Sequence, residues 1–400
     1  MQKYIILIAA FFIQLCLGAG YSWSTFVPAL KEFYGLTTAQ TQSIFGTGSL
    51  AATILIFLGG RIQDRLGPKI PAFIGGIIFS SSYILAGYSS GSYPALFIFL
   101  GILAPAGVGL AYLCPIACSV KWFPDHKSMV TGFAVAGFGG SAMIISQFGE
   151  YLLSQQIDVL TIFKYMGFGF ISVLAIATMF LKNPPQADNE PEFITNTNMS
   201  ALFQDRKFLG LLCGIFPCFC VGLMVIGNIK PFGLSLRLDI AVAGAAVTIL
   251  ALFNALGRLA WGFAGSVVEG KKIILVSLIS TTIVIIAAPF LVKSTATFYL
   301  FTMLAGFNYS ACLVLYAAEV AHQYGTEKMG TVYSTLFLSN GIAGFVSPTL
   351  AGKIFDITGS YTPAFLIFGF ISLISVFLFY FIYKPQKISR TDAGLYPPRL

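Results

Sequence analysis

LGGRIQDRLGPK (residues 58–69) and WGFAGSVVEGKK (residues 261–272) are two short stretches of similar pattern, one in each half of the chain. Each follows a long apolar run, and aligning them pairs glycine with glycine and lysine with lysine. The matched pairs are Gly59 with Gly262, Gly67 with Gly270, and Lys69 with Lys272. A repeat at this spacing indicates that the chain contains the same structural unit twice.

The composition around these stretches is that of a membrane protein. Of 400 residues, 57% are hydrophobic and only 10% are charged, whereas a soluble protein has about 25% charged residues. So few polar side chains cannot cover a globule of this size, which excludes a soluble enzyme, a nucleic-acid-binding domain and a disordered chain. The seven cysteines are too sparse, and odd in number, for a disulfide scaffold.

Apolar runs predict the fold. A membrane-spanning helix needs about 20 mainly apolar residues to cross ~30 Å of hydrocarbon, and the chain has twelve such runs. They lie at roughly 4–30, 42–60, 71–90, 94–118, 129–152, 163–181, 208–229, 240–264, 273–292, 296–320, 329–352 and 362–383. A polar, proline-containing segment, 182–207, separates the first six from the last six. We therefore predict an all-α membrane protein with twelve transmembrane helices in two pseudo-symmetric six-helix halves.

The basic residues predict the orientation, because cytoplasmic loops carry an excess of Lys and Arg. With a cytoplasmic N-terminus, sixteen of the 23 basic residues fall on the cytoplasmic side and six on the other. We expect a multi-pass protein of the plasma (inner) membrane with both termini in the cytoplasm, so the net charge of +8 reflects topology. The expected domains are an N-terminal half (1–181), a cytoplasmic linker (182–207), a C-terminal half (208–383) and a cytoplasmic tail (384–400).

Two six-helix repeats joined by a polar linker are typical of transporters, whose substrate site lies between the repeats near mid-membrane. The stretch GGRIQDRLGPK (59–69) is similar to the motif that follows the second helix in the major facilitator superfamily. The matching residues are Gly60, Asp64, Arg65, Gly67 and Lys69. The resemblance implies a gating motif, in which Asp64 and Arg65 form a latch while Gly60 and Gly67 permit close approach and a tight turn. From the residues alone, charge anchoring beside a turn fits equally well.

Three other stretches resemble the oxalate:formate antiporter and monocarboxylate transporter branch of that superfamily. They are GAGYSWSTF (18–26), GVGLAYLCPIACSVKWFPDHKSMVTGFAVAGFGGSA (107–142) and FNALGRLAWGF (253–263). The resemblance covers nearly the whole chain. It implies a secondary active transporter, not an enzyme, that moves a small organic anion by alternating access.

Arg258 is the most informative single residue. It is the one charge in the apolar run 241–265, where a cation costs at least ~2.5–3.5 kcal/mol to insert. From its position alone it could bind an anion or extend to the headgroups about 10 Å away. The resemblance implies a carboxylate-binding role. Asn254 lies one turn earlier on the same face, where animal monocarboxylate transporters typically have an Asp. Since Asn cannot titrate, any proton coupling must use another route.

Several tyrosines are candidates for the same cavity. A buried phenol needs a hydrogen-bonding partner, although most aromatic residues in such a chain serve in packing or face lipid. By resemblance, Tyr21, Tyr112 and Tyr309 complete the substrate-binding shell, and Phe337 forms an apolar wall.

Asn340 bears on the charge of the substrate. The oxalate transporter has an intramembrane Lys in its eleventh helix, and the matching position here is Asn340. One buried cation in the second half, where that transporter has two, favours a monoanion over oxalate.

We therefore expect a carrier of a monocarboxylate such as lactate, pyruvate or formate, driven by a proton gradient or by exchange. The alternatives are a dicarboxylate (oxalate) exchanger and an exporter of unrelated small molecules. The expected partners are the anion, a proton and the lipid bilayer, and the carrier is expected to act as a monomer. No nucleic acid, cofactor or metal is expected, since the only two histidines fall in predicted loops.

Overall fold

The computed structural model describes residues 2–123, 127–184, 199–324 and 326–384. At residues 57, 60, 61, 64, 65, 127–129, 131, 199, 200 and 326–331 it describes the backbone alone. The described residues form helices connected by short loops, and they include no strand. The predicted all-α fold class is confirmed.

The first half contains six helical rods. They are α1 (Gln2–Leu17) with the 3₁₀ turn η1 (Gly18–Ser22) and α2 (Trp23–Tyr34); α3 (Thr38–Leu66); α4 (Lys69–Ala86); α5 (Tyr93–Leu96) with the π-helix η2 (Phe97–Leu103), α6 (Ala104–Ala111) and α7 (Leu113–Trp122); α8 (Lys127–Ser154); and α9 (Val159–Met179). The first and fourth rods therefore contain a 3₁₀ and a π interruption, which the apolar runs did not predict.

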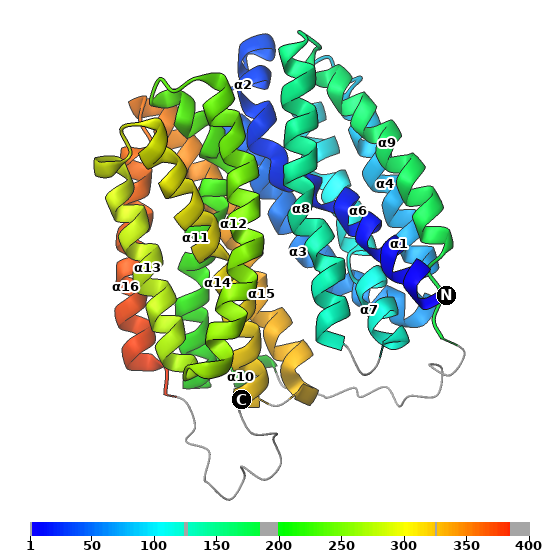
Figure 1. Cartoon of the computed structure of the whole chain (residues 1–400), viewed down its shortest axis with the longest axis vertical. Coiled ribbons are helices and arrows are strands. Elements are labelled where there is room, and N and C mark those ends of the chain that lie inside the picture. The colour runs from blue at the N-terminus through cyan, green and yellow to red at the C-terminus, as the bar shows by residue number, and fades with distance from the viewer. Residues whose placement is uncertain (1, 124–126, 185–198, 325, 385–400) are drawn as a thin grey trace, which may run out of the picture.

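The second half begins with the short helix α10 (Met199–Leu202), followed by six long helices. They are α11 (Arg206–Ser235), α12 (Ile240–Val267), α13 (Gly270–Leu291), α14 (Thr295–Tyr324), α15 (Thr326–Thr358) and α16 (Thr362–Ile382). Figure 1 shows the halves side by side, blue to teal and green to red, with the end of α2 at the top. Buried apolar residues form one cluster within 6–181 and another within 202–383.

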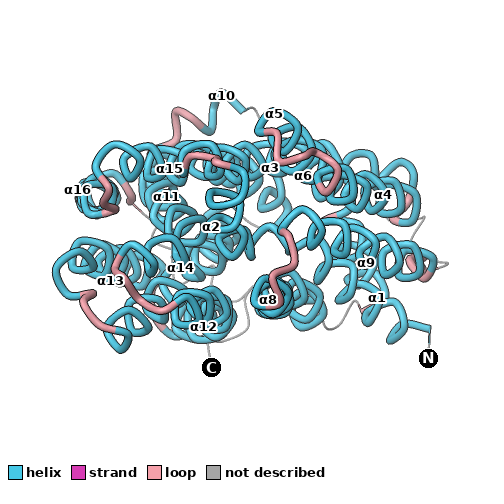
Figure 2. The backbone as a smooth tube through the Cα atoms, turned by 90° about the horizontal axis from the view of Figure 1, so that it is seen from above, coloured by secondary structure: helices cyan, strands magenta, loops and turns pink. Residues whose placement is uncertain are grey.

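Two seams join the halves. In one, α3 packs along α15; in the other, α8 packs along α12. Both pairs lie side by side in the view from above (Figure 2). We call them the α3–α15 seam and the α8–α12 seam, and we call the end of the bundle where α2 finishes the α2 end.

Ten helical segments of the described chain are long and apolar enough to cross a membrane, and α3 and α15 are not among them. The prediction of twelve spans is thus met for ten. In α3 and α15 the search covers only part of each helix, because the side chains at 57, 60, 61, 64, 65 and 326–331 are not described. The two helices meet in the α3–α15 seam, which buries polar side chains such as Thr41, Gln42 and Ser347. Because these faces meet protein and not lipid, they need not be apolar.

Glycines allow the helices of the first half to approach closely. Gly75 of α4 and Gly107 of α6 face each other: a Cβ built on Gly75 would lie 2.6 Å from the Gly107 carbonyl oxygen, and one on Gly107 would lie 2.5 Å from the Gly75 oxygen. Both obstacles are backbone atoms, so no side chain can move aside. Small residues at such contacts are the usual means of packing membrane helices.

Gly107→Ala is therefore expected to destabilise the protein by about 1–3 kcal/mol, the cost of overpacking a close contact. The measurement is the apparent Tm in detergent. The matched control is Gly169→Ala on exposed α9, where a Cβ meets nothing within 4 Å and better helix propensity makes Ala neutral or mildly stabilising. Equal Tm values for the two variants would contradict the close-packing interpretation.

Candidate functional site

Arg258 lies within α12 on the side of the α8–α12 seam. Its Nε donates a hydrogen bond to Asn254 Oδ1 at 3.1 Å, and Asn254 is buried. The amide thus fixes the plane of the guanidinium from one turn away and leaves its terminal nitrogens directed elsewhere. Within the described part of the chain, those nitrogens have no recorded hydrogen bond and no carboxylate within 4.0 Å.

The guanidinium reaches the other half at Gly139 of α8. A Cβ on Gly139 would stand 4.0 Å from Arg258 Cζ and Nη2. A glycine here leaves space in front of the cation, whereas a Cβ on the next residue, Gly140, would meet nothing within 4 Å. The one cation that sequence analysis singled out therefore lies where the two halves meet.

Tyrosines from both halves lie near Arg258. Tyr21 of η1 and Tyr112 between α6 and α7 come from the first half, and Tyr309 of α14 comes from the second. Each interacts electrostatically with Arg258, and the side chains of Tyr21 and Tyr309 also pair with each other across the halves. The structure thus brings together all three tyrosines that the resemblance indicated.

Phe138 is a member of this cluster that the sequence analysis missed. Its ring packs edge-on against Tyr21 and against Tyr112, with centroids 5.3 Å apart in each case. It therefore holds both phenols in place beside Gly139, the next residue of α8. Its position within the GFAVAGFGG run was the available signal, but the glycines there drew attention to helix packing alone.

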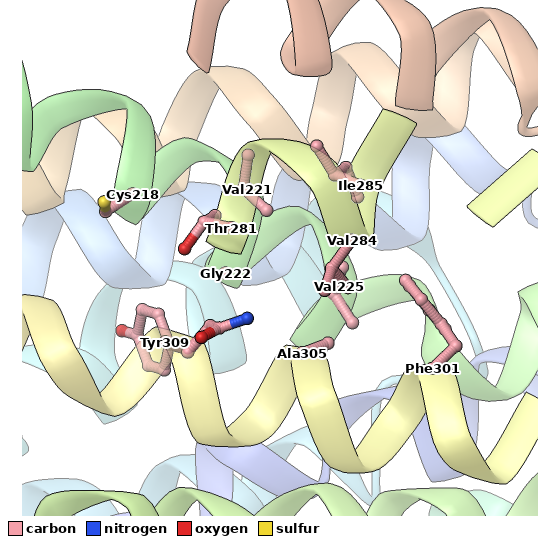
Figure 3. A pocket seen from close by; sticks show the side chains of 11 residues that line it. Cys218, Val221, Gly222, Val225, Thr281, Val284, Ile285, Phe301, Ala305 and Tyr309 are labelled. Carbon is pink, nitrogen blue, oxygen red and sulfur yellow. The ribbon is translucent and has the colours of Figure 1, made fainter. Parts of the chain in front are cut away.

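Tyr309 is held from behind by a glycine. Its ring packs directly on Gly222 of α11, where any Cβ would overlap the ring. Behind it lies a small pocket between α11, α13 and α14, lined mainly by apolar side chains such as Val225 and Phe301 (Figure 3). Because this pocket is enclosed by the second half alone, it is separate from the seam and shares only Tyr309 with the Arg258 cluster.

Phe337 and Asn340 of α15 lie farther from the guanidinium. Phe337 packs edge-on against Phe219, 5.5 Å between centroids, and contacts Tyr333 at 5.9 Å. Tyr333, in turn, interacts electrostatically with Arg258. Asn340 instead donates a hydrogen bond from Nδ2 to Thr53 Oγ1 of α3 at 3.3 Å, so its recorded contact is in the α3–α15 seam.

The gating motif is described in part. The side chains of Gly60, Asp64 and Arg65 lie outside the described residues. Gly67 ends α3 with φ of +73°, a left-handed backbone angle that favours glycine. The tight turn expected there is present.

Among the described residues, side-chain contacts between the halves lie from the α2 end to the middle of the bundle. In the α3–α15 seam they run from Asp356, whose carboxylate accepts the amides of Thr38 and Ala39 at 3.0 and 2.7 Å, to Asn340 with Thr53. In the α8–α12 seam they run from the α2 end to Gly139 and Arg258. Within the described residues, every recorded hydrogen bond between the halves falls in this part of the bundle.

The largest departure from the sequence analysis is Lys230. The sequence analysis placed it in an outer loop, but α11 continues to Ser235 and buries it. The expectation of one buried cation in the second half is therefore wrong, although Lys230, unlike Arg258, is paired with a carboxylate. Its Nζ pairs with Glu150 of α8 at 2.6 Å, joining the two halves. The apolar residues that follow Lys230 were the signal that the helix continues.

Comparison with known proteins identifies the architecture. The family model of the Major Facilitator Superfamily matches residues 7–235 and 211–395. The chain belongs to the Major Facilitator Superfamily. Solved structures of this fold include the nucleoside transporter NupG and a D-xylose–proton symporter, each with a TM-score of 0.77 at 15% identity over 96% of this chain and, respectively, 100% and 98% of the other.

Curated relatives of this major facilitator include carriers of carboxylates. The oxalate:formate antiporter of Oxalobacter formigenes is 24% identical over 94% of this chain and 90% of its own length. Monocarboxylate transporter 12 of Mus musculus is 21% identical over 92% and 82%. The protein is a multi-pass membrane transporter of small molecules, and its relatives are transporters and not enzymes.

A counter-charge placed opposite Arg258 tests this geometry. Gly139→Asp puts a carboxylate beside the guanidinium, and a charge-assisted pair of this kind contributes about 1.5–3 kcal/mol. We expect a higher apparent Tm in detergent than for the control Gly140→Asp, because a Cβ on Gly140 meets no atom of Arg258 within 4 Å. Adding Arg258→Ala should abolish the difference between the two aspartate variants. A difference that survives Arg258→Ala would place the guanidinium elsewhere.

Proposed function

We propose that this protein carries a small monocarboxylate of the size of lactate, pyruvate or formate across the membrane by alternating access, with Arg258 binding the carboxylate. The observation that supports this most strongly is a cation at the seam whose hydrogen-bonding partner, within the part of the chain that the structure describes, is the neutral amide of Asn254. A cation in a low-dielectric site needs a counter-charge, and an anionic substrate supplies it.

The chemistry of the cluster suits a carboxylate. Guanidinium presents a planar fork of donors that matches two carboxylate oxygens and stays charged at physiological pH. Asn254 occupies Nε, which leaves the terminal nitrogens for the substrate. The hydroxyls of Tyr21, Tyr112 and Tyr309 can donate further hydrogen bonds to it.

Because these groups come from both halves, binding of the substrate is coupled to the relative movement of the halves. Arg258 and Tyr309 belong to the second half, whereas Tyr21 and Tyr112 belong to the first. A substrate that contacts both sets interacts differently with each arrangement of the halves, as a ligand must in order to shift a conformational equilibrium. The names of the relatives, an oxalate:formate antiporter and a monocarboxylate transporter, support the same substrate class.

The remaining parts of the proposal follow from the sequence. The halves 1–181 and 208–383 rock about the site, and the motif at Gly60, Asp64, Arg65 and Gly67 latches the end that faces the cytoplasm. Both termini are cytoplasmic, the membrane is the plasma (inner) membrane, and the carrier works as a monomer. Either a co-transported proton or exchange for another anion drives the flux.

A monoanion is favoured over oxalate because α15 has Asn340 where a second cation would be needed. Phe337, which packs on Phe219, gives the apolar side of the site. An exporter of cations is disfavoured, because it would need a carboxylate near the guanidinium, and the described residues place none within ion-pairing distance.

Arg258→Ala should reduce uptake of labelled pyruvate or formate into proteoliposomes by roughly 100-fold, the factor that corresponds to losing ~3 kcal/mol of charge-assisted hydrogen bonding. The control is Lys293→Ala, which removes an exposed cation from the same half and should leave uptake unchanged. Normal uptake by the Arg258 variant would reject the proposed site.

Asn340→Lys should raise uptake of oxalate relative to formate by roughly tenfold, because a second cation pairs with the second carboxylate. Asn340→Met, which removes the amide without adding charge, serves as the control and should not change the ratio. Wild-type preference for oxalate, or no effect of the lysine, would contradict the single-cation argument.

A further inference from the structure

Lys230 and Glu150 form an ion pair inside the bundle that the proposed function does not use. The Nζ–Oε1 distance is 2.6 Å, and the side chains are 3% and 21% exposed. Lys230 also donates to the Thr25 carbonyl oxygen of α2 at 3.1 Å. Glu150 and Thr25 belong to the first half and Lys230 to the second, so the pair crosses between the halves.

Glu150 also lies close against α12. Gly244 of α12 lies against the carboxylate, and a Cβ there would stand 2.7 Å from both Glu150 Cδ and Oε1. Arg258 is on the same helix as Gly244. It lies 14 residues farther along the chain, which is about 21 Å along the helix axis. One end of the α8–α12 seam is therefore closed by Glu150, and the other is at the proposed substrate site.

Three other charged groups near this end have partners of their own. Lys31 of α2 donates to Thr38 Oγ1 at 2.6 Å. Asp158 at the start of α9 accepts from Tyr34 at 2.7 Å and from its own helix amides. Asp356 caps α3. On the helices packed against Glu150, the charged side chain recorded in contact with it, among the described residues, is Lys230 alone.

We propose that Lys230 and Glu150 form an acid-sensitive latch that holds the two halves together at the α2 end, and that a proton on Glu150 releases it. In the closed arrangement the two charges neutralise each other. Protonation removes the negative charge and leaves Lys230 buried as a lone cation, a situation that typically costs several kcal/mol. Opening the α2 end returns the lysine to water and removes that cost.

The direction of the pH effect follows from this arrangement. The latch is intact where Glu150 is ionised, so the α2 end is held closed at higher pH. A proton on Glu150 shifts the population toward the arrangement that is open at the α2 end. This inference does not depend on which anion is carried, because it concerns only how the halves meet.

The structure supplies a reporter for opening. The amides of Thr38 and Ala39 donate to Asp356 across the halves, so hydrogen–deuterium exchange there reports separation at the α2 end. The amides of Leu160 and Thr161 donate to Asp158 of their own half. They report general loosening and serve as the internal control at every pH.

The experiment compares the full chain in lipid nanodiscs with Glu150→Gln and with the double variant Glu150→Gln/Lys230→Met. The single variant should accelerate exchange at Thr38 and Ala39 by roughly tenfold or more, because it leaves Lys230 unpaired. The double variant should exchange like the wild type, since removing both charges leaves none buried. Lowering the pH should raise the ratio of the exchange rate at the reporter amides to that at the control amides in the wild type. It should leave this ratio unchanged in the double variant.

Three outcomes would overturn the latch. They are a single variant that exchanges like the wild type, a double variant as fast as the single one, and an equal pH response in wild type and double variant. If the single variant also accelerates exchange at Leu160 and Thr161, it is misfolded, and the pH response of the double variant decides. Because exchange needs no substrate, these results are independent of the uptake assays.

Discussion

The structure depends on how two cations are neutralised inside a membrane protein. A buried charge must have a counter-charge, and the chain solves this differently at its two inner cations. Lys230 has Glu150, a carboxylate contributed by the opposite half. Among the described residues, the hydrogen-bonding partner of Arg258 is the neutral amide of Asn254. Since both sites lie where the halves meet, one cation joins the halves and the other is available to a ligand.

Much of this arrangement could be predicted from the sequence. The apolar runs determine the helical class and the position of Arg258 within a span, because both follow directly from the cost of polar groups in lipid. The convergence of Tyr21, Tyr112 and Tyr309 on Arg258 came from the resemblance, since residues so distant in sequence meet only through the tertiary fold. The role of these residues in binding remains a proposal, although their proximity is a structural fact.

The features that sequence analysis missed share a physical reason. Lys230 was counted with the outer basic residues because the predicted span ends at residue 229, and its burial depends on a partner on α8. Phe138 was overlooked because an aromatic residue among glycines has no chemical signal of its own. The polar side chains of the α3–α15 seam are buried because the two helices meet each other. Each of these depends on a neighbour that lies far away in the sequence.

The first turn of α3 depends on a carboxylate of the other half, that of Asp356. The first amides of a helix have no acceptor within the helix. At the start of α3, Thr37 and Gln40 satisfy each other's amides through a capping box. The two amides between them, on Thr38 and Ala39, donate to Asp356 in the other half of the molecule. The first turn of α3 is therefore complete only while the halves touch at this end. The N-terminal cap of this helix is thus shared between two segments more than 300 residues apart in the chain.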